Sequence, residues 1–321
     1  MNQYHQSGIA YHIQQTRHKL TQFCPCPSHD LHDGAPLVGL HSVAQLVDTL
    51  NSGIGSSVEA NTVVGAADVI VDGTGNADDI NAVFAEGSGT PECSVTAKGY
   101  KYFLYYSAQP KDGGHKQMGV AVADAPTGPF VDLGHPLISK EPEGFHGQLI
   151  DVDVFVDPVS KKPYLYWGNG MMAGAELNAD MTSIKEETIT LMTPKGGSLR
   201  DYAYREAPYV FYRNGLYYFM WSVDDTGSPN YHVAYGTSTS PLGPIKVADK
   251  PVVLQQDAQR EIYGTAHNSV IQVPGTDEWY IVYHRINKDW LRHQPGVHRE
   301  TCIDRLYFNA DGTIKPVVPT E

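Results

Sequence analysis

Positive charge is scarce in this chain, and so are charged residues altogether. Its 321 residues include 23 lysines and arginines against 36 aspartates and glutamates, which gives a formal net charge of −13 at pH 7. Nucleic acids and anionic membranes are bound through clustered basic side chains, so this composition argues against both partners. An acidic chain rich in tyrosine is instead compatible with a neutral polymer such as a polysaccharide.

The chain also lacks a disulfide framework and any long apolar run. Of its four cysteines, Cys24 and Cys26 are separated only by Pro25, and Cys93 and Cys302 lie far apart, which predicts free thiols. No apolar run approaches the roughly 20 residues of a membrane-spanning helix. The first 20 residues are polar and lack the apolar core of a secretion signal. Localisation stays open between the cytoplasm and a secreted or periplasmic protein whose signal was removed.

What the sequence does contain is a long repeat. Four segments pair a polar residue with an aromatic-rich strand, and they begin at Glu92, Asp151, Glu206 and His267. Their spacing of 55 to 61 residues, with short strands separated by turns, is typical of the blades of a β-propeller. The first strand of a propeller blade lines the central axis, so we expect these four side chains to converge there.

Two near-identical segments mark a further strand inside the repeats. Residues 121–130 and 234–245 both read as a strand that ends in a turn rich in proline and glycine. We interpret each as the third strand of its blade and the turn beyond it. Five blades of about 58 residues fit the length of the chain. The predicted fold is therefore all-β, a five-bladed β-propeller with an atypical first blade.

The first 85 residues differ from the rest of the chain. No tyrosine or tryptophan occurs between His12 and Gly99, although the chain has 20 tyrosines and 4 tryptophans. Residues 1–85 are predicted to be an atypical N-terminal segment with the first blade, and residues 86–321 the remaining blades of a single propeller domain. The segment is a diverged blade, a stretch read in a shifted frame, or a different element.

Residues from about Glu92 to Val318 resemble glycoside hydrolase family 43, a family of five-bladed propellers. The matching pieces, in the family's order and spacing, are Ile150-Asp151, Arg205-Glu206-Ala207-Pro208, Gly264-Thr265-Ala266-His267-Asn268-Ser269, Tyr283-His284-Arg285 and Arg299-Glu300-Thr301. The resemblance implies an inverting, exo-acting glycosidase that removes terminal α-L-arabinofuranosyl or β-D-xylosyl residues. Its partner would be a neutral pentose-containing oligosaccharide or polysaccharide, and no cofactor would be required.

Inverting hydrolysis requires two carboxyl groups, a protonated one that donates to the leaving oxygen and an ionised one that activates water, roughly 6.5–9.5 Å away. By the resemblance, Glu206 is the acid, because it precedes an apolar strand where partial desolvation favours the protonated form. Asp151 is a third carboxylate that orients the acid and keeps it protonated through like-charge repulsion. The alternative for Glu206 is that it only caps a turn. The alternative for Asp151, which is followed by Asp153 and Asp157, is that it is a turn residue.

The general base is where the chain departs from the family, whose members carry it as an aspartate that opens the first blade. Asp30 and Asp33 have the right spacing, whereas Asp68 has a better local strand but lies only 24 residues before Glu92. We prefer Asp30 as the base. The alternatives are a carbohydrate-binding propeller that lacks a base, or an endo-α-1,5-L-arabinanase.

Two residues of the matching motifs are expected to contact substrate. Arg299 matches an arginine that, in the family, contacts the sugar or the base carboxylate; the alternative is a surface ion pair with Glu300. His267 resembles an axial histidine that, in many members, helps to hold a cation or a water at the propeller centre. The resemblance thus implies a cation site, for example for Ca²⁺, at His267, and the alternative is a hydrogen-bonded core histidine.

Two further sets of side chains are candidates for ligand contact. Trp167, Phe145 and Trp221 are predicted to form walls on which a sugar stacks, although most aromatic residues of the chain must belong to the core. Residues 24–32 contain two cysteines and two histidines, which are ligand types for zinc. The one-residue spacing of the cysteines is tighter than usual, so chance clustering is the favoured interpretation of this motif.

Overall fold

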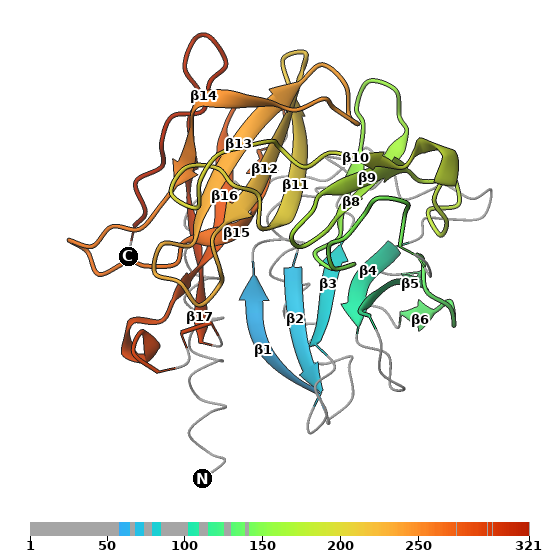
Figure 1. Cartoon of the computed structure of the whole chain (residues 1–321), viewed down its shortest axis with the longest axis horizontal. Coiled ribbons are helices and arrows are strands. Elements are labelled where there is room, and N and C mark those ends of the chain that lie inside the picture. The colour runs from blue at the N-terminus through green and yellow to red at the C-terminus, as the bar shows by residue number, and fades with distance from the viewer. Residues whose placement is uncertain are drawn as a thin grey trace, which may run out of the picture.

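The computed structural model describes residues 58–64, 68–73, 79–84, 102–108, 115–124, 130–138, 141–273, 275–293, 295–296 and 298–320. Within these residues the chain is all-β, as predicted, and its only helical elements are the single-turn 3-10 helices η1 (Glu186–Thr188) and η2 (Lys288–Trp290) (Figure 1). Over the same residues, no helix has the length and apolar character needed to cross a membrane.

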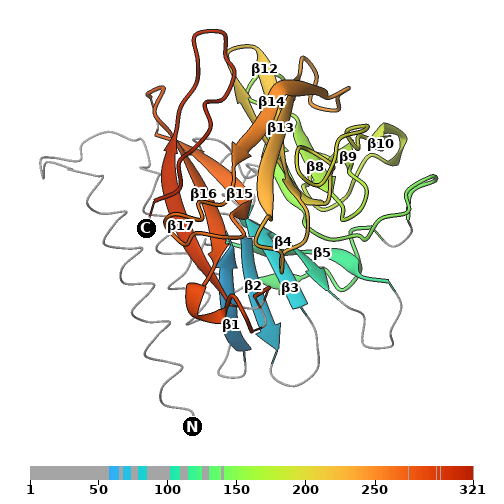
Figure 2. The same ribbon diagram turned by 60° about the vertical axis from the view of Figure 1, so that its left-hand side comes forward.

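The described strands form four antiparallel sheets (Figures 1 and 2). The first contains, in order, β1 (Val58–Val64), β2 (Asp68–Gly73), β3 (Asp79–Phe84), β4 (Tyr102–Ala108), β5 (Gln117–Ala123) and β6 (Val131–Asp132). The second contains β7 (Asp153–Val156), β8 (Pro163–Trp167), β9 (Ala173–Glu176) and β10 (Thr190–Leu191). The third contains β11 (Glu206–Arg213), β12 (Leu216–Val223), β13 (His232–Ser238) and β14 (Lys246–Leu254), and the fourth β15 (Ala266–Gln272), β16 (Trp279–Ile286) and β17 (Arg299–Leu306).

Each repeat that begins at Asp151, Glu206 or His267 folds into one sheet, so the repeat identified three structural units correctly. β13 is the third strand of its sheet, as its turn sequence predicted. Glu92 lies outside the described residues, and its aromatic strand is β4, which pairs with β3 of the predicted N-terminal segment. The described residues form four sheets, so the five-bladed arrangement and the atypical first blade stay predictions.

Aromatic residues fill the middle strands because these strands are covered on both faces. β11 contacts both β7 and β15, and β1 of the first sheet contacts β17 of the fourth. Hydrophobic clusters lie between the successive sheets, centred on fully buried side chains such as Leu165, Phe219 and Ile281. A strand buried on both faces needs a continuous apolar sequence, as β12 shows with seven consecutive buried residues. Each such side chain contributes roughly 1.5–3 kcal/mol.

Three residues at the starts of the inner strands share a left-handed backbone: Asp151 at φ 58°, Ala207 at φ 55° and His267 at φ 50°. This conformation costs a non-glycine residue roughly 1–3 kcal/mol, so the surroundings must maintain it. The pairing register shifts next to Ala207 and His267, which marks β-bulges in β11 and β15. By backbone conformation Ala207, rather than Glu206, is the counterpart of Asp151 and His267, so Glu206 lies one residue earlier than the sequence repeat indicated.

Candidate active site

Glu206 is the first residue of β11 and is 9% exposed. Its Oε1 accepts a hydrogen bond of 2.7 Å from the hydroxyl of Tyr231, and its Oε2 accepts one from Nδ2 of Asn169. The adjacent Arg205 instead forms an ion pair of 3.2 Å with Asp225. The two hydrogen-bond partners of Glu206 are therefore neutral, and they fix the orientation of a nearly buried carboxyl group.

Asp151 is bound to the residue that follows Glu206. Its side chain is 6% exposed, and its Oδ2 accepts a hydrogen bond of 3.1 Å from the backbone N–H of Ala207. In the same way, Asp153 Oδ2 accepts a hydrogen bond of 3.0 Å from the N–H of Val210. Two aspartates of the second sheet thus bind backbone groups of β11, which ties the second sheet to the third and holds Asp151 beside Glu206.

The negative charges of Glu206 and Asp151 affect the pKa of two buried tyrosines, Tyr231 and Tyr204. Burial raises the pKa of Tyr231 well above its ordinary value, and the nearby Glu206 and Asp151 raise it further. Burial also raises the pKa of Tyr204, with the same two carboxylates adding to the effect. Tyr204 donates its hydroxyl hydrogen to the carbonyl of Gly168 at 2.5 Å. Both phenols therefore remain protonated donors at any pH at which the protein would work.

His284 lies against the ring of Tyr231, and His267 lies next to His284. His267 is 8% exposed and donates its backbone N–H to Ser222 Oγ at 2.9 Å. The ring of His284 lies 5.5 Å from that of Tyr231, nearly parallel to it, and 6.3 Å from that of His267. Burial lowers the pKa of His284 well below its usual value, and the charges of Arg299 and His267 lower it further. Neither ring nitrogen of His284 has a hydrogen-bond partner in the described part of the chain.

Arg299 begins β17 at the same end of the fourth sheet. Its Nη1 donates to Thr226 Oγ1 at 3.3 Å, and its charge acts on His284. Glu300, the partner in the alternative interpretation, accepts hydrogen bonds from Arg285 at 2.9 Å and from Asn287 at 2.8 Å. The structure thus places Arg299 beside the buried histidine of the candidate site.

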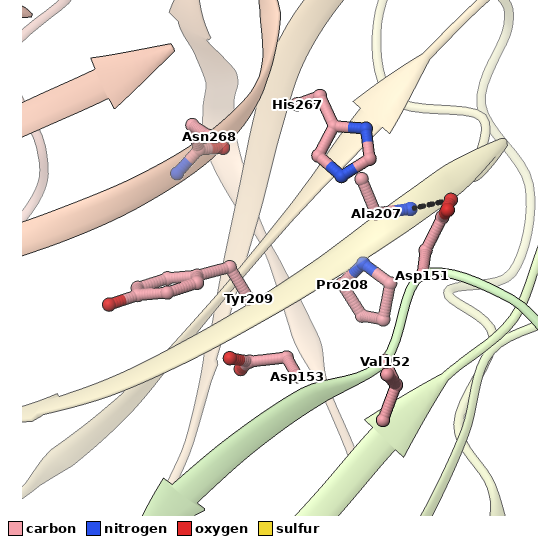
Figure 3. Close-up of a pocket in the computed structure, with 8 residues that line it drawn as sticks. All are labelled: Asp151, Val152, Asp153, Ala207, Pro208, Tyr209, His267 and Asn268. Atoms are coloured by element: carbon pink, nitrogen blue, oxygen red, sulfur yellow. Dashed lines mark hydrogen bonds between the residues drawn. The ribbon is translucent and has the colours of Figure 1, made fainter. Parts of the chain in front are cut away.

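The starts of β7, β11 and β15 enclose a small pocket (Figure 3). It is lined by Asp151, Val152, Asp153, Ala207, Pro208, Tyr209, His267 and Asn268. Figure 3 shows Asp151 and His267 on either side of Ala207, whose side chain is a single methyl group. The cavity volume of about 10 Å³ matches one water molecule.

Only some of the residues predicted to form the base and metal sites are among the described residues. Asp30, Asp33 and the cysteine–histidine cluster of residues 24–32 lie outside the described residues, and Asp68 begins β2 without a described side chain. Among the described residues, no three His, Cys, Asp or Glu side chains converge as a metal site would require. The described side chains therefore do not build a metal centre, and the cation at His267 stays a prediction.

The aromatic walls proposed from the sequence need correction. Trp167 and Trp221 are fully buried and Phe145 is 2% exposed, and all three lie inside the hydrophobic clusters between sheets. Trp221 donates its indole N–H to the carbonyl of Tyr202 at 3.0 Å. A ring packed on both faces cannot stack on a sugar, so these three residues belong to the core.

Sequence reasoning missed the two partners of Glu206. Asn169 follows β8 by two residues, and Tyr231 precedes β13 by one. Both positions lie at the sheet ends where the inner strands begin, because antiparallel strands alternate in direction. An inspection of polar residues at those strand ends, rather than at the repeat starts alone, would have found them.

Comparisons with known proteins agree with this geometry. The model of the glycosyl hydrolases family 43 matches residues 89–314. A β-D-galactofuranosidase of Aspergillus niger is 38% identical over 220 residues, which cover 68% of this chain and 59% of that protein. An arabinoxylan arabinofuranohydrolase of Paenibacillus polymyxa is 28% identical over 241 residues, covering 68% of this chain and 35% of the relative. The chain thus spans less than two thirds of the length of both relatives.

A solved structure shares the fold. The crystal structure of a thermostable family-43 glycoside hydrolase is similar with a TM-score of 0.62 and 28% sequence identity, covering 75% of this chain and 76% of that one. The family match includes β4 to β17 and every candidate site residue from Phe145 to Arg299. This protein belongs to glycosyl hydrolases family 43.

Proposed function

We propose that the chain is an inverting exo-glycosidase that releases terminal α-L-arabinofuranosyl or β-D-xylosyl residues from plant cell-wall oligosaccharides or polysaccharides. The observation that carries the proposal is the carboxyl group of Glu206, nearly buried and oriented by two neutral partners beside a second carboxylate. The family membership and the glycosidase names of the relatives support it. In this proposal no cofactor is required.

The proposed architecture is a five-bladed propeller whose first blade comes from residues 1–85, with residues 86–321 forming the other blades of one catalytic domain. The pocket lined by the starts of β7, β11 and β15 supports an axis at which the site residues gather. A general base from the first blade would then face Glu206 across that axis.

Glu206 would protonate the glycosidic oxygen as the bond to the sugar breaks. Asn169 suits this role because its amide offers both a donor and an acceptor, so it can bind the carboxyl group before and after proton transfer. Tyr231 donates in both states, since burial and the neighbouring carboxylates keep its hydroxyl protonated. Neither partner brings a positive charge that would hold Glu206 ionised.

Asp151 would orient the acid without touching the proton that is transferred. Its bond to the N–H of Ala207 fixes the chain directly after Glu206 and thereby the position of the acid. The left-handed backbone at both Asp151 and Ala207 is consistent with strain retained for positioning.

A second carboxylate must activate water on the opposite face of the sugar, roughly 6.5–9.5 Å from the acid. We propose Asp30 for this role, with Asp33 and Asp68 as the other candidates. Arg299 would contact a sugar hydroxyl or the base carboxylate, and His267 would contact substrate or an axial water. Two observations support a place for Arg299 in the site: its hydrogen bond to Thr226, and the effect of its charge on the pKa of His284.

The first test is hydrolysis of three 4-nitrophenyl glycosides by the purified chain beside its Glu206→Gln variant. The sugars are α-L-arabinofuranose, β-D-xylopyranose and, because of the Aspergillus niger relative, β-D-galactofuranose. Turnover of at least one that the substitution abolishes, with the fold retained, supports the proposal. Binding of oligosaccharides without turnover would instead support a carbohydrate-binding propeller, and release of internal oligomers from debranched arabinan would support an endo-arabinanase.

A further inference from the structure

The loop between β16 and β17 lies at the end of the fourth sheet that carries the site. In the antiparallel pairing, Ala266 faces His284, and Ile286 faces Arg299. The described residues that join these strands, 287–293, 295–296 and 298, therefore lie at the end of the sheet where β15 begins at Ala266, next to His267. We call them the β16–β17 loop.

This loop packs against the turn that holds both arginines of the site. A Cβ on Gly296 would lie 3.4 Å from backbone atoms of Gly227, so the two segments are in close contact. The same turn accepts the hydrogen bond of Arg299 through Thr226, and its Asp225 pairs with Arg205, the residue before Glu206. The β16–β17 loop is thus joined to the candidate active site by a short chain of contacts.

Trp290 is an exposed aromatic residue on this loop with a rigid support. It is 39% exposed, and its ring stacks on that of His298 with centroids 3.7 Å apart and planes 23° from parallel. Asn287 caps the helical turn by accepting the N–H of Asp289 at 3.0 Å, and its own N–H binds the carbonyl of His298 at 2.9 Å. The indole is therefore held in place before any ligand arrives.

The surroundings of Trp290 favour a sugar over a protein partner. A protein-docking surface is a contiguous apolar patch, whereas the exposed neighbours of Trp290 are polar: Lys288, Asp289, Arg292 and His293. A single supported ring among hydrogen-bonding groups suits a sugar, whose C–H face packs on an aromatic ring while its hydroxyls bind polar groups.

We propose that Trp290, supported by His298, is a stacking subsite for a neutral pentose chain that continues beyond the sugar held at Glu206. The proposal rests on the proposed function and deepens it. It assigns to this chain a preference for oligosaccharides over small glycosides, because only a longer substrate reaches from the catalytic carboxyl to the loop.

The test compares Trp290→Ala with Trp290→Phe and with Tyr307→Ala. Tyr307 is a matched control, since it is 54% exposed but follows Leu306, which pairs with Trp279 at the opposite end of the sheet. Affinity for xylohexaose and for a 1,5-linked arabinohexaose is measured by calorimetry in the Glu206→Gln background. KM for each hexasaccharide and for the 4-nitrophenyl glycosides is measured in the active background.

We expect Trp290→Ala to weaken hexasaccharide binding roughly threefold to tenfold, the range of a single aromatic stacking contact. KM should rise more for the hexasaccharide than for the 4-nitrophenyl glycoside, Trp290→Phe should recover most of the loss, and Tyr307→Ala should match the parent. Parental affinity of Trp290→Ala for both hexasaccharides would overturn the proposal. If the parent hydrolyses nothing while Trp290→Ala still weakens binding, the proposed function fails and the subsite stands.

Discussion

Replacing Tyr231 by phenylalanine removes one hydroxyl from the candidate site and leaves the ring in place. That hydroxyl is fully buried and donates to Glu206 Oε1 at 2.7 Å. The ring would keep its stacking on His284. The substitution therefore isolates one of the two contacts that orient the proposed acid, the other being the amide of Asn169.

The size of the effect follows from the chemistry of the bond. A hydrogen bond between a neutral donor and a group that carries charge contributes about 1.5–3 kcal/mol, so kcat should fall roughly 10- to 100-fold. The burial that raises the pKa of Tyr231 keeps its hydroxyl a hydrogen-bond donor over the pH range of the assay.

The assay is kcat and kcat/KM for the best 4-nitrophenyl glycoside between pH 5 and pH 9, with folding followed by circular dichroism. Tyr283→Phe is the matched control: Tyr283 is also fully buried and donates to a carboxylate at 2.7 Å, but its partner is Asp304, which takes no part in the proposed chemistry. Tyr283→Phe should lower the free energy of unfolding and leave kcat and kcat/KM unchanged. A Tyr231→Phe variant with wild-type kcat at every pH tested would refute the reasoning.

Two further predictions concern Asp151 and His284. Asp151→Asn replaces the charged acceptor of the Ala207 N–H by a neutral amide, so kcat should fall about tenfold with the fold retained; wild-type kcat would reject the positioning role of Asp151. His284 remains neutral in the folded chain but takes up a proton near pH 6.5 when unfolded, because burial and then Arg299 and His267 lower its pKa. The free energy of unfolding should therefore fall below pH 6.5 by up to about 1.4 kcal/mol per pH unit, and urea unfolding at pH 7 and pH 5 should show a smaller fall for His284→Phe. Equal falls in both proteins would contradict the buried neutral state.

The sequence was most informative where one requirement recurs in the second, third and fourth sheets. A polar residue lies at the start of the first strand of each of these sheets, so Asp151, Glu206 and His267 could be brought together from spacing alone. The repeat could not resolve the β-bulge at Ala207, which displaces Glu206 by one position, because a bulge adds a residue without changing the strand pattern.

Three kinds of residue were not predicted from the repeat. Asn169 and Tyr231 lie at strand ends that differ between the sheets, so the repeat does not mark them. Trp167 and Trp221 were expected to contact the sugar, whereas sheets stacked against one another bury both faces of β8 and β12. Trp290 lies in a loop, where sequence periodicity gives no information.

General-acid catalysis by Glu206 is the central claim, and dependence on the leaving group tests it most directly. An acid is needed most when the leaving oxygen is strongly basic, as in an oligosaccharide, and least for 2,4-dinitrophenolate. The ratio of wild-type kcat/KM to that of Glu206→Gln should therefore be far larger for an oligosaccharide than for a 2,4-dinitrophenyl glycoside of the same sugar. Equal ratios for the two substrates, or wild-type activity of Glu206→Gln on the oligosaccharide, would contradict the claim.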